Sequence, residues 1–224
     1  MNLTWQQIPS PIITEILCSL SDGVVLDTEH ASFDSGTLAN CIQVARLSGK
    51  QCFVRLTEIS NTRIRQCLDS GATGLIFSTI ETSQQAELIR RFSLFPPNGN
   101  RGLGLVRSNL WGESGLLTED PILIPQIETK PGVDNLEEIA KFNFDYYLIG
   151  PYDLSLSLNI PGKFDNKVFM SYIDKVKEKI PLNKLAVHLP KNVQEQISDY
   201  ADYGLKCLGM DTIAILEYHK EVMK

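Results

Sequence analysis

Short apolar runs in this 224-residue chain are repeatedly followed by residues that can transfer protons or bind ions. Those residues are Asp27, Glu29 and His30 after the second run, Arg55 after the third, Gln126 and Glu128 after the fifth, Asp153 after the sixth and Asp211 after the eighth. Alone, each has an ordinary structural explanation, such as a helix N-cap for an aspartate or a surface ion pair for an arginine. Together they predict a ligand or metal site, because gathering ionisable groups at one place costs solvation energy unless a ligand uses them.

Two of the carboxylates, Glu128 and Asp153, follow consecutive apolar runs. On neighbouring strands, two buried carboxylates would repel each other, and a divalent cation between them removes that repulsion. A set of oxygen ligands alone favours Mg²⁺ or Mn²⁺ over zinc, with Co²⁺ as an alternative. Two protein ligands leave coordination positions free, so a 2-oxo acid can bind the cation through its carbonyl and one carboxylate oxygen.

The other charged residues indicate how such a substrate would react. Arg55 can face the substrate oxygens and stabilise the charge of an enolate. His30 can move a proton through a water molecule, with Asp27 or Asp69 setting the orientation and pKa of its imidazole. His188, after the seventh run, is a candidate contact for a second substrate, although a structural role is the stronger interpretation.

The chain is organised as eight apolar runs, each followed by a segment with helical periodicity. The expected strands are residues 3–5, 23–26, 51–55, 74–77, 122–127, 146–149, 185–187 and 207–209. The expected helices are residues 11–20, 35–48, 60–69, 82–94, 133–141, 153–178 in two pieces, 192–203 and 212–223. Alternating strands and helices predict an α/β fold with a parallel sheet, and eight repeats predict a (β/α)8 TIM barrel with its active site at the carboxyl ends of the strands. An open doubly wound sheet is the alternative, but no glycine-rich phosphate-binding turn follows Trp5 or Leu26.

Length and composition agree with one barrel domain over residues 1–224, with short loops, because such barrels usually need about 250 residues. The chain is 43% hydrophobic and has a net charge of −6, without the basic clusters that nucleic-acid binding requires. Five scattered cysteines without C-x-x-C spacing argue against structural zinc and a disulfide framework. The absence of a secretory leader and of an apolar run of roughly 20 residues predicts a cytoplasmic protein with no membrane or nucleic-acid partner.

Several segments together resemble the HpcH/HpaI aldolase family, the class II, metal-dependent pyruvate aldolases, over nearly the whole chain. The segments are PIITEI (11–16), VVLDTEHA (24–31), FVRL (53–56), LDSGATG (68–74), PPNGNRGLG (96–104), QIET (126–129), IGPYDLSLSLNIPG (149–162) and GMDT (209–212). The combination of LDTEH with IGPYDLS is specific, whereas RGLG alone is weak. The resemblance implies a barrel of the phosphoenolpyruvate/pyruvate-binding type, similar to 4-hydroxy-2-oxoheptanedioate and 2-dehydro-3-deoxyglucarate aldolases.

The resemblance also implies roles for individual residues. Glu128 and Asp153 would be the metal ligands, and Arg55 the arginine that stabilises the pyruvate enolate. His30, with Asp27, would be the acid/base assembly.

Further roles follow for residues around that centre. Asp69 matches an aspartate that positions the histidine across a subunit contact, and Gln126 matches a glutamine at the pyruvate end. The backbone around Tyr152 and Asp153, at a helix start, would receive the substrate carboxylate. Relatives form trimers or hexamers in which the last helix packs on a neighbour, so a homotrimer or homohexamer is expected.

Three departures from the family pattern affect the wall of the expected pocket. Ser78 and Thr79 stand where relatives usually have a proline and an apolar residue. The segment from Gly104 to Gln126 is shorter, and Trp111 stands where a tyrosine is common. Trp111 is a candidate substrate contact that caps the pocket, with a packing role as the alternative.

The resulting hypothesis is an aldehyde-lyase that reversibly cleaves a 4-hydroxy-2-oxo acid to pyruvate and an aldehyde through a pyruvate enolate. A related lyase acting on CoA thioesters, of the citrate lyase beta-subunit type, is the nearest alternative, although no basic cluster suited to the CoA nucleotide is evident. A non-catalytic barrel used as a binding protein is the alternative from a different class.

Overall fold

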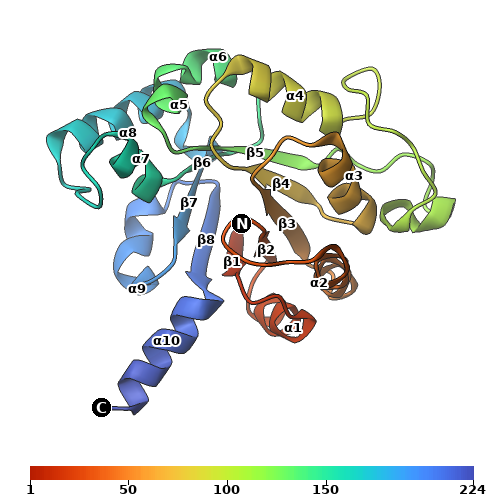
Figure 1. Ribbon diagram of the computed structural model, residues 1–224, viewed down its shortest axis with the longest axis horizontal. Coiled ribbons are helices and arrows are strands. Elements are labelled where there is room, and N and C mark those ends of the chain that lie inside the picture. The colour runs from red at the N-terminus through yellow and green to blue at the C-terminus, as the bar shows by residue number, and fades with distance from the viewer.

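Eight parallel strands form a closed barrel in the order in which they occur along the chain, which confirms the predicted TIM barrel (Figure 1). The computed structural model describes residues 1–224. The strands are β1 Asn2–Gln6, β2 Gly23–Asp27, β3 Gln51–Leu56, β4 Gly74–Phe77, β5 Ile122–Ile127, β6 Tyr147–Ile149, β7 Leu185–Leu189 and β8 Leu205–Met210. Each one lies within two residues of the bounds expected from the apolar runs.

Helices follow the strands and surround the barrel (Figure 1). They are α1 Pro11–Leu20, α2 Ser35–Leu47, α3 Asn61–Ser70, α4 Ser83–Ser93, α5 Lys130–Asp134, α6 Leu136–Ala140, α7 Pro151–Ser157, α8 Lys167–Lys179, α9 Val193–Gln196 and α10 Asp211–Val222. Side-chain caps set several of the starts. The Asp34 carboxylate accepts from the backbone of Gly36 and Thr37 before α2, and Thr82 forms a capping box with Gln85 before α4.

Two of the expected helices are interrupted. The segment predicted as one helix over 133–141 is divided into α5 and α6, because Asn135 has a non-helical backbone between them. The helix expected over 192–203 is only α9, followed by the 3₁₀ segment η3, Ile197–Tyr200. The connection between α4 and β5 contains a short 3₁₀ segment, η1 Arg107–Gly112, in which Trp111 has a positive φ of 55°.

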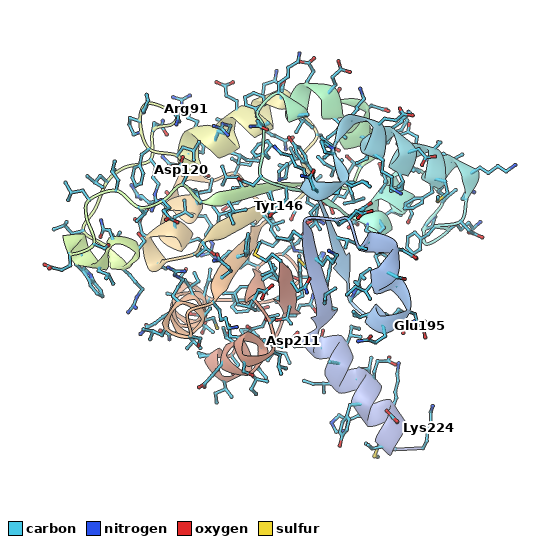
Figure 2. The ribbon with its side chains drawn as sticks, turned by 180° about the vertical axis from the view of Figure 1, so that it is seen from behind. Arg91, Asp120, Tyr146, Glu195, Asp211 and Lys224 are labelled. Atoms are coloured by element: carbon cyan, nitrogen blue, oxygen red, sulfur yellow. The ribbon has the colours of Figure 1, made fainter.

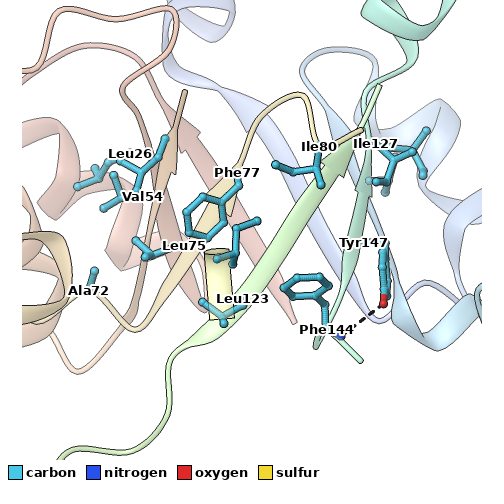
Figure 3. Close-up of a cluster of buried hydrophobic side chains, with 14 of the residues drawn as sticks. Leu26, Val54, Ala72, Leu75, Phe77, Ile80, Leu123, Ile127, Phe144 and Tyr147 are labelled. Carbon is cyan, nitrogen blue, oxygen red and sulfur yellow. Dashed lines mark hydrogen bonds between the residues drawn. The ribbon is translucent and has the colours of Figure 1, made fainter. Parts of the chain in front are cut away.

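Alternating side chains of the strands fill two separate apolar layers. The inner layer, inside the barrel, contains Leu3, Trp5, Val25, Phe53, Ile76, Ile124, Leu148, Ala186, Leu205 and Cys207. The outer layer is a cluster of 38 buried residues, in which strand residues such as Val54, Leu75 and Phe77 pack with the helices. Figure 3 shows part of this outer layer, from Leu26 on one side to Tyr147 on the other. The inner layer closes the barrel below the carboxyl ends of the strands, so a site there has a packed floor.

Helix α10 projects away from the barrel, from Asp211 at its base to Lys224 at the C-terminus (Figures 1 and 2). Large apolar side chains are exposed on α10 and just after it, namely Ile215, Leu216, Tyr218, Val222 and Met223. Exposed apolar surface of this kind is typical of a face that contacts another protein. None of the helices is long and apolar enough to cross a membrane.

Candidate active site

The inward-facing positions of the strands change from apolar to polar toward the carboxyl ends. On β2, Val25 belongs to the inner layer, and Asp27 follows two residues later. On β3, Phe53 belongs to that layer and Arg55 follows at the same spacing, as Gln126 follows Ile124 on β5. Because side chains alternate along a strand, the period that fills the barrel also directs these polar groups into its mouth.

Asp27 and Arg55 form a buried ion pair. Arg55 donates from Nε to Asp27 Oδ1 at 2.9 Å and from Nη2 to Asp27 Oδ2 at 2.6 Å. Trp5 Nε1 and Gln7 Nε2 also donate to Oδ2, at 3.2 and 3.0 Å. Burial disfavours the charge on Asp27, but the hydrogen bonds and the charge of Arg55 outweigh it and lower the pKa to about 2. Asp27 is therefore ionised at neutral pH, and its charge holds Arg55.

Glu29 is a second carboxylate on the same arginine, and it was not among the residues assigned a role from the sequence. Its Oε2 lies 2.7 Å from Arg55 Nη1 and accepts a hydrogen bond from Ser78 Oγ at 2.8 Å. Arg55 has five N–H groups, of which two donate to Asp27, while Nη1 forms an ion pair with Glu29. N–H groups on the two terminal nitrogens remain for a ligand.

His30 is largely exposed, and its Nε2 lies 3.9 Å from Glu29 Oε2. Asp27 does not contact the imidazole. Its Oδ1 instead accepts from the backbone N–H of Glu29, at 3.0 Å, and of His30, at 3.3 Å. Asp27 thus orders the turn that carries the histidine.

Glu128 lies just beyond β5, is buried, and accepts hydrogen bonds on both carboxylate oxygens. Thr79 donates to Oε1 from its backbone N–H at 2.7 Å and from Oγ1 at 2.8 Å. Gln126 Nε2 donates to Oε2 in a short contact. Gly150, after β6, is required here, because a Cβ at that position would lie 2.5 Å from Glu128 Oε2 and 2.6 Å from Glu128 Cβ.

Burial raises the pKa of Glu128, and the nearby charges of Glu29 and Asp153 raise it further, against the hydrogen bonds from Thr79. Asp153 lies in the first turn of α7 with an exposed side chain. The negative charges of Glu29 and Asp153 thus make the ionised form of Glu128 less favourable. A bound cation would relieve this repulsion.

The donor set fits a hard divalent cation. Glu128 and Asp153 offer carboxylate oxygens, and Gln126 Oε1 is buried without a hydrogen-bond partner. Reversing the Gln126 amide would place its oxygen against Glu128 Oε2, so the unpartnered atom is the oxygen. Oxygen donors of this kind suit Mg²⁺ or Mn²⁺, with the remaining positions filled by water or substrate.

A cavity of about 470 Å³ lies at the carboxyl end of the barrel, and Gln126 and Asp153 line it, whereas Glu128 lies behind Gln126 and is not part of the lining. Its lining includes Trp5, His30, Arg55, Gln126, Tyr152 and Asp153. The structure thus brings together most of the residues singled out in the sequence. Their individual catalytic and binding roles stay predictions.

His188, on β7, also lines this cavity. Its ring stacks on Trp5, with centroids 4.2 Å apart and planes at 14°. Burial lowers the pKa of His188 to about 4, and the charge of Arg55 contributes in the same direction. His188 is therefore neutral at pH 7, and its Nε2 is buried without a partner.

Asp69 and Trp111 lie elsewhere, in a second cavity of about 500 Å³ between α2, α3 and η1. Asp69 accepts from Arg101 Nη2 at 2.9 Å. Within one chain neither residue reaches the barrel mouth. The expected contact of Asp69 with a histidine involves a neighbouring subunit, so it stays a prediction, as does the substrate contact of Trp111.

Asp211 has a structural role in this chain. Its carboxylate accepts from the backbone N–H groups of Gln7 and Ile8, at 2.9 and 2.8 Å, and so ties the start of α10 to the segment after β1. Gln7 in turn reaches Asp27. The N-cap interpretation of Asp211 is wrong, because Met210 holds the N-cap position of α10 and Asp211 is its first residue.

Comparison with known proteins supplies the family. The profile of the HpcH/HpaI aldolase/citrate lyase family matches residues 5–207. A hydroxypyruvate/pyruvate aldolase of Rhizorhabdus wittichii is 33% identical over 159 residues, which cover 69% of this chain and 63% of that protein. A 2-keto-3-deoxy-L-rhamnonate aldolase of Shigella boydii is 32% identical over 165 residues, 70% of this chain and 62% of that protein. These matches therefore span less than two thirds of either relative.

The crystal structure of an HpcH/HpaI aldolase/citrate lyase family protein from Burkholderia cenocepacia superimposes with a TM-score of 0.88. The match covers 100% of this chain and 93% of that chain, at 24% sequence identity. At that identity the superposition shows the fold alone, whereas the match to the family model shows the family. The chain belongs to the HpcH/HpaI aldolase/citrate lyase family.

Proposed function

We propose that residues 1–224 act as one metal-dependent aldolase domain that cleaves a 4-hydroxy-2-oxo acid to pyruvate and an aldehyde, or joins the two. The observation that carries this proposal is the lining of the barrel mouth, where Arg55, with N–H groups that Asp27 does not use, faces the same cavity as Gln126 and Asp153. An anionic 2-oxo acid matches this lining, because its negative charge is complementary to Arg55 and its oxygens can chelate a cation beside Gln126 and Asp153. The aldolase names of the two relatives support the same reaction class.

Glu128 and Asp153 would hold Mg²⁺ or Mn²⁺, with Co²⁺ as an alternative. When bound, the cation supplies Lewis-acid polarisation of the 2-oxo group. The substrate carboxylate would lie at the start of α7, near Tyr152 and Asp153, where the backbone N–H groups of the first turn have no partner within the helix.

In the cleavage direction, the proton of the C4 hydroxyl leaves through a water molecule to His30. The electron pair of the C3–C4 bond then forms the enolate of pyruvate, and the aldehyde departs. Arg55, held in place by Asp27 and Glu29, donates its free N–H groups to the developing negative charge. Protonation of C3 completes pyruvate.

The partners of the chain would be the 2-oxo acid, the aldehyde and further copies of the chain. A homotrimer or homohexamer would cover the apolar face of α10 and place Asp69 of one copy near His30 of another. Light scattering after size exclusion measures the assembly. Replacing Tyr218 by Asp should dissociate it without altering any residue of the barrel mouth.

Hydrogen exchange of pyruvate tests the enolate chemistry without knowledge of the aldehyde. In D₂O with Mn²⁺ or Mg²⁺, the enzyme should replace the methyl protons of pyruvate by deuterium, followed as loss of the methyl signal in proton NMR. Chelation of the metal should stop the exchange, and Glu128→Gln should reduce it at least about a hundredfold. Mn²⁺ binding that depends on Glu128 but gives no exchange would contradict the aldolase and favour a binding protein.

The aldehyde requires a separate experiment. A panel of aldehydes incubated with pyruvate and Mn²⁺, with products identified by mass spectrometry, should give a 4-hydroxy-2-oxo acid for the accepted members. A citrate-lyase-like activity would instead consume a CoA thioester in the same assay format.

A further inference from the structure

Two hydroxyl residues follow β4, and each binds a different carboxylate of the barrel mouth. Ser78 Oγ donates to Glu29, whose other partner is Arg55. Thr79 donates twice to Glu128, from its backbone N–H and from Oγ1. The mechanism proposed above uses neither hydroxyl. The carboxylate beside the arginine and the carboxylate of the cation site are therefore held by separate residues.

The hydrogen bonds to Glu128 determine which of its atoms is free. A carboxylate offers about four lone-pair positions, two on each oxygen. Thr79 occupies both positions on Oε1, whereas Gln126 occupies one on Oε2. One position on Oε2 remains, so Glu128 has a single place at which a cation can bind.

The backbone of Thr79 adds an independent observation. Its φ is +54°, in the left-handed region that a β-branched residue rarely adopts. In this conformation its amide and hydroxyl reach the same oxygen, 2.7 and 2.8 Å away. A strained conformation persists where surrounding interactions over-determine it, and such positions cluster at functional sites.

We propose that Thr79 is a positioning residue for Glu128, whose hydroxyl fixes Oε1 so that Oε2 alone is presented to the divalent cation. This inference rests on the metal-dependent function proposed above. Thr79 does not touch the substrate in this role. It sets the orientation of the ligand carboxylate, and thereby the affinity for the cation before any substrate binds.

Three variants separate this role from a structural one. Thr79→Val removes the hydroxyl but keeps the branched side chain and the backbone N–H. Thr79→Gly also removes the hydroxyl but tolerates a φ of +54° without strain. Thr79→Ser keeps the hydroxyl. Ser78→Ala is the matched control, because it removes the neighbouring hydroxyl, which donates to Glu29 rather than to Glu128.

The measurement is the dissociation constant of Mn²⁺ by electron paramagnetic resonance, which detects the free ion, together with the thermal unfolding midpoint of each apo protein. Losing a hydrogen bond to a charged group should weaken Mn²⁺ binding about tenfold in Thr79→Val and Thr79→Gly. Thr79→Ser and Ser78→Ala should stay within about twofold of the wild type. Thr79→Gly should keep the wild-type unfolding midpoint, so that its weaker binding cannot come from loss of fold.

Failure of this inference and failure of the proposed function give different results. The role of Thr79 alone would be overturned if Thr79→Val and Thr79→Gly both bound Mn²⁺ with wild-type affinity while Glu128→Gln still weakened binding. Wild-type binding that is unaffected by Glu128→Gln would overturn the metal site, and the role of Thr79 with it. A tenfold loss confined to the two variants without the hydroxyl supports the inference.

Discussion

Asp27 and Arg55 are register partners on the adjacent strands β2 and β3, and two hydrogen bonds join their side chains inside the barrel mouth. The orientation of the arginine is therefore set by strand pairing and by a buried carboxylate, and not by a loop. Glu29 forms an ion pair with the other terminal nitrogen, Nη1. The two carboxylates therefore fix the guanidinium before any substrate binds, which is the requirement for stabilising charge that develops during a reaction.

Replacing Arg55 by Lys should lower kcat for aldol cleavage and the rate of pyruvate deuterium exchange by at least about a hundredfold each. Lysine keeps the positive charge. Its single ammonium cannot contact both Asp27 and Glu29 and also donate to the substrate, as the planar guanidinium can. Steady-state kinetics and proton NMR give the two rates, and circular dichroism checks the fold. Exchange at the wild-type rate in Arg55→Lys would rule out the guanidinium as the stabiliser of the enolate.

Acid should destabilise the protein through Asp27. Its pKa is about 2 in the folded chain, below the ordinary value of 3.8, so the ionised form stabilises the fold above about pH 4. That stabilisation, on the order of 2 kcal/mol, should be lost as the pH falls from about 4 to 2. Urea unfolding between pH 2 and 6 measures it. Asp27→Asn should be less stable at pH 6 and should lack this part of the pH dependence; an unchanged acid limb would contradict the assignment.

The fold and much of the barrel mouth could be predicted from the sequence, because both follow from one regularity. Apolar runs of strand length define the barrel, and the two-residue period that fills its interior continues into Asp27, Arg55 and Gln126. Once the strands are parallel and closed, those side chains must converge. Glu128 continues the same period one residue beyond β5, and Asp153 reaches the same end of the barrel from the first turn of α7, four residues beyond β6.

The remaining contacts could not be predicted, because they depend on the geometry of segments far apart in the chain. Thr79 and Glu128 are 49 residues apart, and their contact requires the left-handed backbone of Thr79. The closest sequence signal was the departure of Ser78 and Thr79 from the family pattern. Trp111 was expected to cap the pocket or to have a packing role, and within this chain it lines the cavity between α2, α3 and η1.

His188 should remain neutral across the physiological pH range. Its pKa is about 4, so its imidazole should not titrate between pH 5 and 8. Because the ordinary value is 6.5, the unfolded chain takes up a proton first, and stability should fall as the pH drops from about 6.5 to 4. Nitrogen-15 NMR of the three imidazoles, assigned with His188→Gln, checks this. A His188 signal that titrates near pH 6.5 would contradict its burial against Trp5.

Replacing Gly150 by Ala should weaken the cation site without changing any charged residue. The added Cβ would lie 2.5 Å from Glu128 Oε2 and 2.6 Å from Glu128 Cβ, so the carboxylate must move. We expect Mn²⁺ affinity to fall at least about tenfold, since a ligand displaced by a few tenths of an ångström loses its geometry, as with other changes around a metal site. Gly102→Ala is the matched control, because no atom lies within 4 Å of a Cβ there and its φ is not positive. Isothermal titration of both variants with Mn²⁺ measures the difference. Equal affinities for the two would mean that Glu128 is not held against the backbone of Gly150 when the cation binds, and that the carboxylate reaches the ion from another direction.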